Sequence, residues 1–111
     1  MNNKNNTGWK EALKDFTQRV SKLYGNKLES VILYGSHARE EATEQSDIDL
    51  LIVLKDFKEF WEEFHRISPT ASSVSLEHNV VISAIPMKKE EYEGKITPLL
   101  LNVKREGKVV V

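Results

Sequence analysis

A Gly-Ser turn and a pair of aspartates, each attached to an apolar run, constrain this chain more than any other feature. The β-rich run Ser30–Tyr34 is cut off by Gly35, and Asp47 and Asp49 open a second apolar run that ends at Leu54. Runs of this kind favour buried strands. The second run becomes apolar on both faces, which is typical of a central strand that is covered on both sides.

Helical periodicity surrounds these two strands. Apolar residues recur at steps of one, three or four from Trp9 to Tyr24, and a second stripe follows Asp56, which we expect to cap its helix. Pro69 predicts a kink or a break in that helix. The spacing also predicts that its aromatic residues belong to the core; these are Phe57, Phe60, Trp61 and Phe64.

The bounds of the remaining elements are predicted from helix-capping residues and from residues that end helices and strands. Thr97 and Pro98 form a good N-cap and first-turn pair, and Gly107 is a natural stop. The predicted order is helix 9–24, strand 30–34, short helix 36–45, strand 47–54, helix 57–78, strand 79–85 ended by Pro86, a turn or two of helix over 88–92, helix 98–105 and an edge strand 109–111. This order predicts the α/β (α+β) class, with helices packed against a small mixed sheet.

Composition bounds the class of protein. The chain has 111 residues, the size of one domain, with 16 Lys and Arg against 17 Asp and Glu. The near-neutral charge argues against a dedicated nucleic-acid binder. No cysteine is present, which excludes thiolate chemistry, and the longest apolar run is too short to cross a membrane. We expect one cytoplasmic domain over residues 1–111, with the polar residues 1–7 disordered.

The Gly-Ser turn has the properties of a phosphate site. A strand that ends in Gly35 and Ser36 and turns into a helix presents free backbone N–H groups and a hydroxyl. Gly35 lets the backbone approach a ligand closely. Arg39, one helical turn later, adds a positive fork for phosphate oxygens. The simpler alternatives are an ordinary tight turn, and an Arg39 that pairs with neighbouring glutamates.

The aspartate pair has the properties of a metal site. Asp47 and Asp49 stand two apart on a strand, so both side chains leave the same face. Carboxylates this close repel each other unless a cation lies between them, and their hard oxygens suit Mg²⁺ or Mn²⁺. Two solvated acids at the start of a strand are the alternative. Aspartate is depleted in strands, so we favour metal binding.

The string GSHAR…SDIDLLIVL, from Gly35 to Leu54, resembles the motif of the polymerase-β-like nucleotidyltransferase superfamily and of its minimal, single-domain members. The resemblance implies that Asp47 and Asp49 hold the catalytic metals. It implies that Gly35 and Ser36 hold the triphosphate, with Arg39 and Ser46 among the nucleotide-binding residues. It also implies a reaction: Mg²⁺-dependent transfer of a nucleoside monophosphate, AMP foremost, to an acceptor hydroxyl.

Two departures from the family pattern stand out. Members often have glycine after the motif arginine, where this chain has Glu40. Catalytic members usually add a third carboxylate from a neighbouring strand, and the predicted strand 79–85 contains none; Glu77 lies before its apolar run.

Three functions therefore stay open. The first is an enzyme that modifies a partner protein. The second is a catalytically weak nucleotide-binding module that acts as antitoxin to a helical HEPN-type partner, as the resemblance implies for minimal members. The third is a degenerate domain that forms a homo-oligomer through the strand edge near 109–111.

Overall fold

The computed structural model describes residues 5–111. The elements in chain order are α1 (Asn5–Tyr24), the 3-10 turn η1 (Gly25–Lys27), β1 (Leu28–Tyr34), β2 (Ile48–Leu54), α2 (Phe60–His78), β3 (Ile82–Lys88), α3 (Lys89–Gly94), α4 (Pro98–Glu106) and β4 (Lys108–Val109). The predicted mixed α/β class is confirmed. The expectation of disorder over 1–7 falls partly on residues 1–4, which lie outside the described residues, and α1 already begins at Asn5.

The sheet has the strand order β3-β2-β1-β4 and is mixed. β1 runs antiparallel to both β2 and β4, whereas β2 and β3 run parallel and are joined by α2. A parallel pair needs a crossover of this kind. The central strand β2 is buried along nearly its whole length, as its two-sided apolar sequence predicts.

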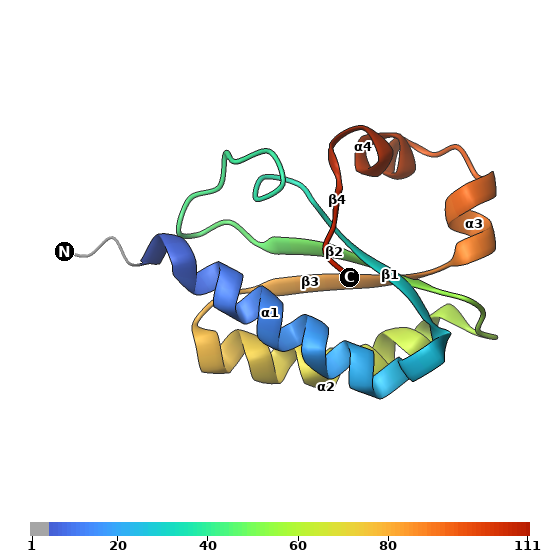
Figure 1. The fold of residues 1–111 in the computed structure, drawn as a ribbon, viewed down its shortest axis with the longest axis horizontal. Helices are drawn as coiled ribbons and strands as arrows, with labels where there is room; N and C mark the ends of the chain where they lie inside the picture. Colours follow the sequence, from blue (N-terminus) through green and yellow to red (C-terminus); the bar gives the residue numbers. More distant parts are fainter. Residues whose placement is uncertain (1–4) are drawn as a thin grey trace.

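Helices cover both faces of the sheet (Figure 1). On one face, α1 and α2 lie side by side and pack against the β1 and β2 side chains that point towards them. α1 contributes a stripe at four-residue spacing, formed by Ala12, Phe16, Val20 and Tyr24. This spacing places one side chain per turn on the core face of a helix.

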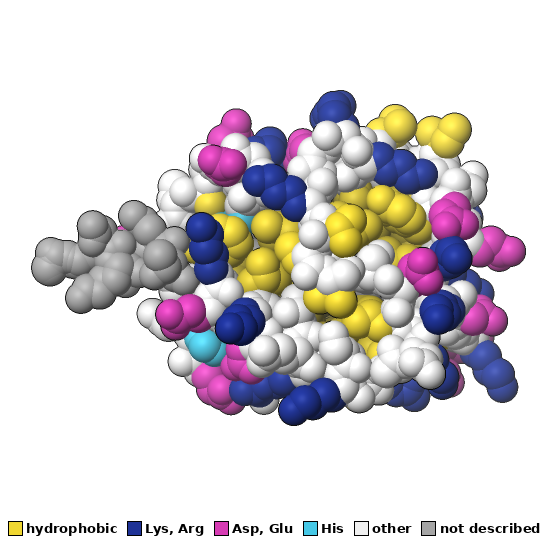
Figure 2. Space-filling view, in the orientation of Figure 1, with side chains coloured by type: hydrophobic (Ala, Val, Ile, Leu, Met, Phe, Trp, Pro, Cys, Tyr) yellow, Lys and Arg dark blue, Asp and Glu magenta, His cyan; other side chains and the backbone are white. Residues whose placement is uncertain are grey.

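The opposite face is covered only in part. Leu100 and Val103 of α4 pack on Ile32, Leu51 and Val53 of the sheet. α4 begins and ends as predicted, because the Thr97 side chain accepts a hydrogen bond from the Leu100 N–H and Gly107 is the C-cap. Figure 2 shows apolar side chains across the middle of one face of the molecule, between α1 and the α4–β4 segment.

The predicted bounds of the strand 79–85 and the predicted start of the helix 57–78 are wrong. β3 spans Ile82–Lys88, and Pro86 lies inside it. An edge strand tolerates proline because the missing N–H has no partner strand on the outer side. Asp56 does not cap α2, which begins at Phe60, and instead accepts a hydrogen bond from the Phe57 N–H.

The predicted helix over 36–45 is absent, and turns take its place. By contrast, α2 continues past Pro69 to His78 as one helix, so the continuation predicted beyond Pro69 is confirmed and the break predicted as one alternative is absent.

The aromatic face of α2 is also a correction. Phe60 and Trp61 are 38% and 64% exposed rather than buried. α2 instead buries Ile67, Val74 and the charged residue Glu63. Glu63 is satisfied by hydrogen bonds from the Tyr24 hydroxyl at 2.9 Å and from Arg66 at 2.8 Å.

Within residues 5–111, no helix combines the length and the apolar character that crossing a membrane requires.

Candidate active site

The Gly-Ser turn and the aspartate pair meet at one end of the sheet. β1 ends at Tyr34, directly before Gly35, and β2 begins directly after Asp47. The antiparallel register of the two strands pairs Tyr34 with Asp49. The motif halves, eleven or more positions apart in the chain, are therefore neighbours across a single ladder.

Gly35 and Asp49 fit together closely. Gly35 has φ +78°, a left-handed conformation that favours glycine. A Cβ atom at this position would overlap the Asp49 Oδ2 atom and would lie 3.3 Å from its Cγ. The glycine is therefore required twice, by the backbone angle and by the carboxylate that lies against it.

The two aspartates differ in exposure. Asp47 is exposed, whereas Asp49 is half-buried at the start of β2. Burial raises the pKa of Asp49, and the negative charge of Asp47 raises it further; His37 and Arg39 act in the opposite direction. A site whose geometry disfavours its own negative charge gains from a cation, so the two carboxylates fit a divalent metal.

The segment between the strands forms turns rather than a helix. Arg39 N–H donates to Gly35 O at 3.1 Å, but Glu41 N–H donates to Ser36 O, which breaks the helical pattern. Glu40 adopts φ +61° and ends the single turn. The donors available to a phosphate are therefore those of a tight turn and not those of the helix that the sequence predicts over 36–45.

The structure engages the other two predicted nucleotide-binding residues elsewhere. The Arg39 guanidinium donates to Glu41 at 2.9 Å and to Glu106, at the end of α4, at 2.6 Å. The Ser46 hydroxyl accepts a hydrogen bond from the Thr43 N–H at 2.9 Å. Arg39 must therefore leave two carboxylates to reach a phosphate. The alternative prediction, that Arg39 pairs with neighbouring glutamates, describes the observed contacts.

Among the described residues, no third carboxylate is grouped with Asp47 and Asp49. The parallel register of β2 and β3 pairs Asp49 with Ser83, so Ser83 lies beside Asp49 on the same face. Glu77 lies in α2 rather than in a strand. Within the part of the chain that the structure describes, the one cluster of three potential metal-ligating side chains lies elsewhere, at Asp15, Glu77 and His78.

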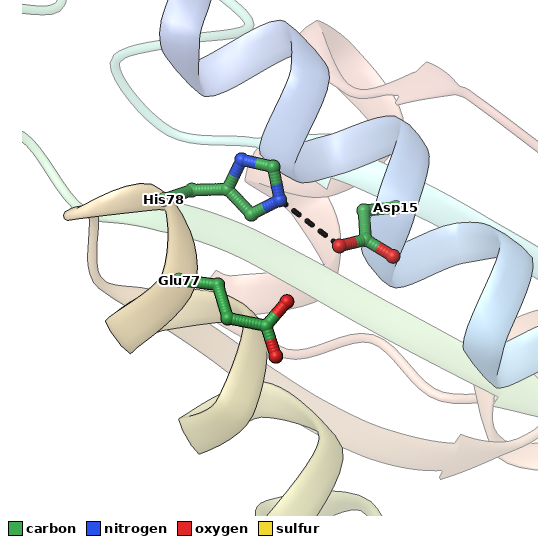
Figure 3. A group of neighbouring side chains, drawn as sticks. All are labelled: Asp15, Glu77 and His78. Atoms are coloured by element: carbon green, nitrogen blue, oxygen red, sulfur yellow. Dashed lines mark hydrogen bonds and ion pairs between the residues drawn. The ribbon is translucent and has the colours of Figure 1, made fainter.

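That cluster joins α1 to α2 (Figure 3). His78 Nε2 lies 2.9 Å from Asp15 Oδ2. The guanidinium of Arg19 donates to both Asp15 oxygens and, at 2.8 Å, to Glu77 Oε1. The arginine already supplies the positive charge there, so the cluster is an ion-pair network between two helices.

One buried residue of the segment escaped the sequence analysis. His37 is only 5% exposed, and its Nε2 atom lies 3.3 Å from the carbonyl oxygen of Ser46. Its ring packs on the Trp9 indole with 4.3 Å between centroids. No periodic pattern marks His37, because its burial depends on α1.

The chain belongs to the nucleotidyltransferase domain family, whose sequence model matches residues 13–108. It is similar to two proposed protein adenylyltransferases of Methanocaldococcus jannaschii. One is 34% identical over 101 residues, which are 90% of this chain and 95% of the relative. The other is 39% identical over 79 residues, which are 71% of this chain and 79% of the relative.

Solved structures share the fold. A toxin–antitoxin structure with AMP-PNP matches with a TM-score of 0.61 and 18% identity over 88% of this chain and 72% of that one. A tri-AMPylated Shewanella oneidensis HEPN toxin in complex with MNT antitoxin gives a TM-score of 0.51 and 18% identity, covering 90% of this chain and 71% of that one. The predicted nucleotidyltransferase fold and the membership of the nucleotidyltransferase family are confirmed.

Proposed function

We propose that this protein transfers AMP from ATP to a hydroxyl group of a partner protein, with Mg²⁺ or Mn²⁺ held by Asp47 and Asp49. The observation that carries the proposal is the contact between Gly35 and Asp49, which joins the turn to the half-buried carboxylate. The family membership supports nucleotidyl transfer, and the relatives described as protein adenylyltransferases support AMP and a protein acceptor.

Each residue has a role in this reaction. A bound divalent metal would neutralise phosphate charge and make the leaving group better. Asp47 and Asp49 hold the metal, while the Gly35–Ser36 turn donates hydrogen bonds to the β- and γ-phosphates. The acceptor oxygen bonds to the α-phosphorus, the bond from that phosphorus to the oxygen bridging the β-phosphate breaks, and pyrophosphate leaves. The proton of the acceptor hydroxyl passes to water.

One observation favours a second candidate function. Ser83 lies beside Asp49, on the strand from which the family resemblance implies a third carboxylate. Without that base, transfer slows by a factor on the order of 10²–10⁴. The second candidate is therefore a weakly catalytic nucleotide-binding module that restrains a HEPN-type helical partner. The toxin–antitoxin neighbours support this type of partner for both candidates.

A transfer assay separates the two candidates. The purified protein is incubated with α-labelled ATP and Mg²⁺ or Mn²⁺, with and without lysate of its source. Asp47→Asn/Asp49→Asn is the inactive variant, and Asp15→Asn, in the other acidic cluster, is the matched control. The enzyme is supported if the wild type and Asp15→Asn both transfer label to a protein and Asp47→Asn/Asp49→Asn does not. Metal-dependent ATP binding with no transferred label supports the module, and absence of both contradicts the proposal.

A further inference from the structure

His37 is a buried polar side chain in the segment between β1 and β2. A carbonyl oxygen only accepts hydrogen bonds, so Nε2 carries the proton in the contact with Ser46 O. The other ring nitrogen, Nδ1, is buried and has no hydrogen-bond partner among the described residues. The imidazole therefore makes its polar contact through Nε2 alone.

This contact joins two halves of the segment. In the first half, Arg39 and Glu41 donate backbone hydrogen bonds back to Gly35 and Ser36. The second half is a separate turn, in which Ser46 N–H donates to Thr43 O at 3.1 Å. Both sets of hydrogen bonds are local.

His37 belongs to the first half, and Ser46 belongs to the second and directly precedes Asp47. The Nε2 hydrogen bond thus spans nine residues of the chain and links the Gly-Ser turn to the aspartate pair. Trp9 of α1 packs on the imidazole ring and fixes its position from outside the segment. Three elements therefore meet at this one side chain.

A purely packing role does not account for histidine here. A phenylalanine would stack on Trp9 and fill the site without burying an unpaired nitrogen, which is unfavourable. The feature that histidine adds is the N–H group directed at Ser46.

We propose that His37 is a positioning residue that sets the distance between the Gly35–Ser36 turn and Asp47. This inference rests on the proposed function of the site, because that distance matters only if one ligand contacts both. A phosphate held by the turn and a metal held by the aspartates must be brought within bonding distance of each other. Groups that orient metal ligands typically change metal affinity by about 10–100-fold when removed.

Two substitutions separate the hydrogen bond from the packing. His37→Phe keeps a ring on Trp9 but has no N–H, whereas His37→Gln places an amide N–H near the position of Nε2. We expect His37→Phe to weaken metal-dependent AMP-PNP binding roughly tenfold. His37→Gln should recover most of that loss, and thermal unfolding should show that both variants fold.

Backbone amide hydrogen exchange over residues 36–49 gives a second readout that needs no nucleotide. His37→Phe should speed exchange in 43–47, and His37→Gln should restore it. Equal exchange and equal binding in wild type and His37→Phe would overturn the proposal, as would a His37→Gln that behaves like His37→Phe. If the wild type binds no AMP-PNP while the exchange pattern holds, the proposed function fails and the positioning contact stands.

Discussion

Replacing Gly35 by alanine tests the close fit between the Gly-Ser turn and Asp49, one of the two proposed metal ligands. The left-handed φ of +78° disfavours alanine, and the new Cβ would overlap the Asp49 carboxylate. The backbone angle alone costs about 1 kcal/mol, being about 1–2 kcal/mol of strain less the entropy that alanine removes from the unfolded chain. Driving Asp49 out of its rotamer adds about 1 kcal/mol.

Gly25 supplies the matched control. It has φ +54°, and a Cβ there meets nothing within 4 Å. Gly25→Ala should therefore lower the free energy of unfolding by only about 1 kcal/mol, and Gly35→Ala by about 2 kcal/mol. In an Asp49→Ala background the overlap disappears, so Gly35→Ala should cost the same there as Gly25→Ala.

Urea unfolding measures these free energies for Gly25→Ala, Gly35→Ala, Asp49→Ala and Gly35→Ala/Asp49→Ala. Calorimetry with AMP-PNP and Mn²⁺ measures how far displacement of the Asp49 carboxylate lowers nucleotide affinity. Gly35→Ala should weaken binding more than tenfold, since Asp49 can no longer occupy its place. If Gly35→Ala costs the same free energy with and without Asp49, and binds nucleotide like the wild type, then the Cβ atom does not displace the Asp49 carboxylate.

Three further predictions follow from single contacts. Burial raises the pKa of Asp49, so its charge destabilises the fold above the unfolded pKa. Asp49→Asn should therefore unfold at a higher temperature than wild type near pH 7 without metal. The difference in unfolding temperature should shrink as acid protonates Asp49, and equal unfolding temperatures at pH 7 would contradict this. Glu106→Gln removes a carboxylate that competes for Arg39, so AMP-PNP affinity should rise several-fold. In an Arg39→Ala background the same substitution should leave AMP-PNP affinity unchanged. Tyr24→Phe removes the buried bond to Glu63 and should lower the unfolding free energy by about 1–2 kcal/mol, with nucleotide affinity unchanged.

Local patterns predicted the elements whose determinants are local. α1 follows from one apolar residue per turn, and α4 from the Thr97 cap and the Gly107 stop. The strands β1 and β2 follow from apolar runs that only a sheet interior accommodates. The placement of Gly35 beside Asp49 needs more than the strands themselves, because it depends on the antiparallel pairing of β1 with β2, which the sequence analysis did not predict.

The errors lie where tertiary structure decides. Ala38 and Ala42 have helical spacing, yet Ala38 belongs to the buried core cluster that α1 and α2 also form, and Glu40 has a positive φ that ends the turn. Pro86 is tolerated because β3 is an edge strand, which the sequence does not state. The role of His37 depends on Trp9, 28 positions earlier in the chain. Contacts of this range leave no periodic signal.

A calorimetric titration tests most directly whether Asp47 and Asp49 hold the metal that nucleotide binding needs. AMP-PNP with Mn²⁺ is titrated into three proteins: wild type, Asp47→Asn/Asp49→Asn and Asp15→Asn/Glu77→Gln. The last variant removes both carboxylates of the group of three potential metal ligands that is found among the described residues. We expect metal-dependent binding to wild type and to Asp15→Asn/Glu77→Gln, and its loss in Asp47→Asn/Asp49→Asn. Binding that survives in Asp47→Asn/Asp49→Asn, or that depends on Asp15 and Glu77, would contradict it.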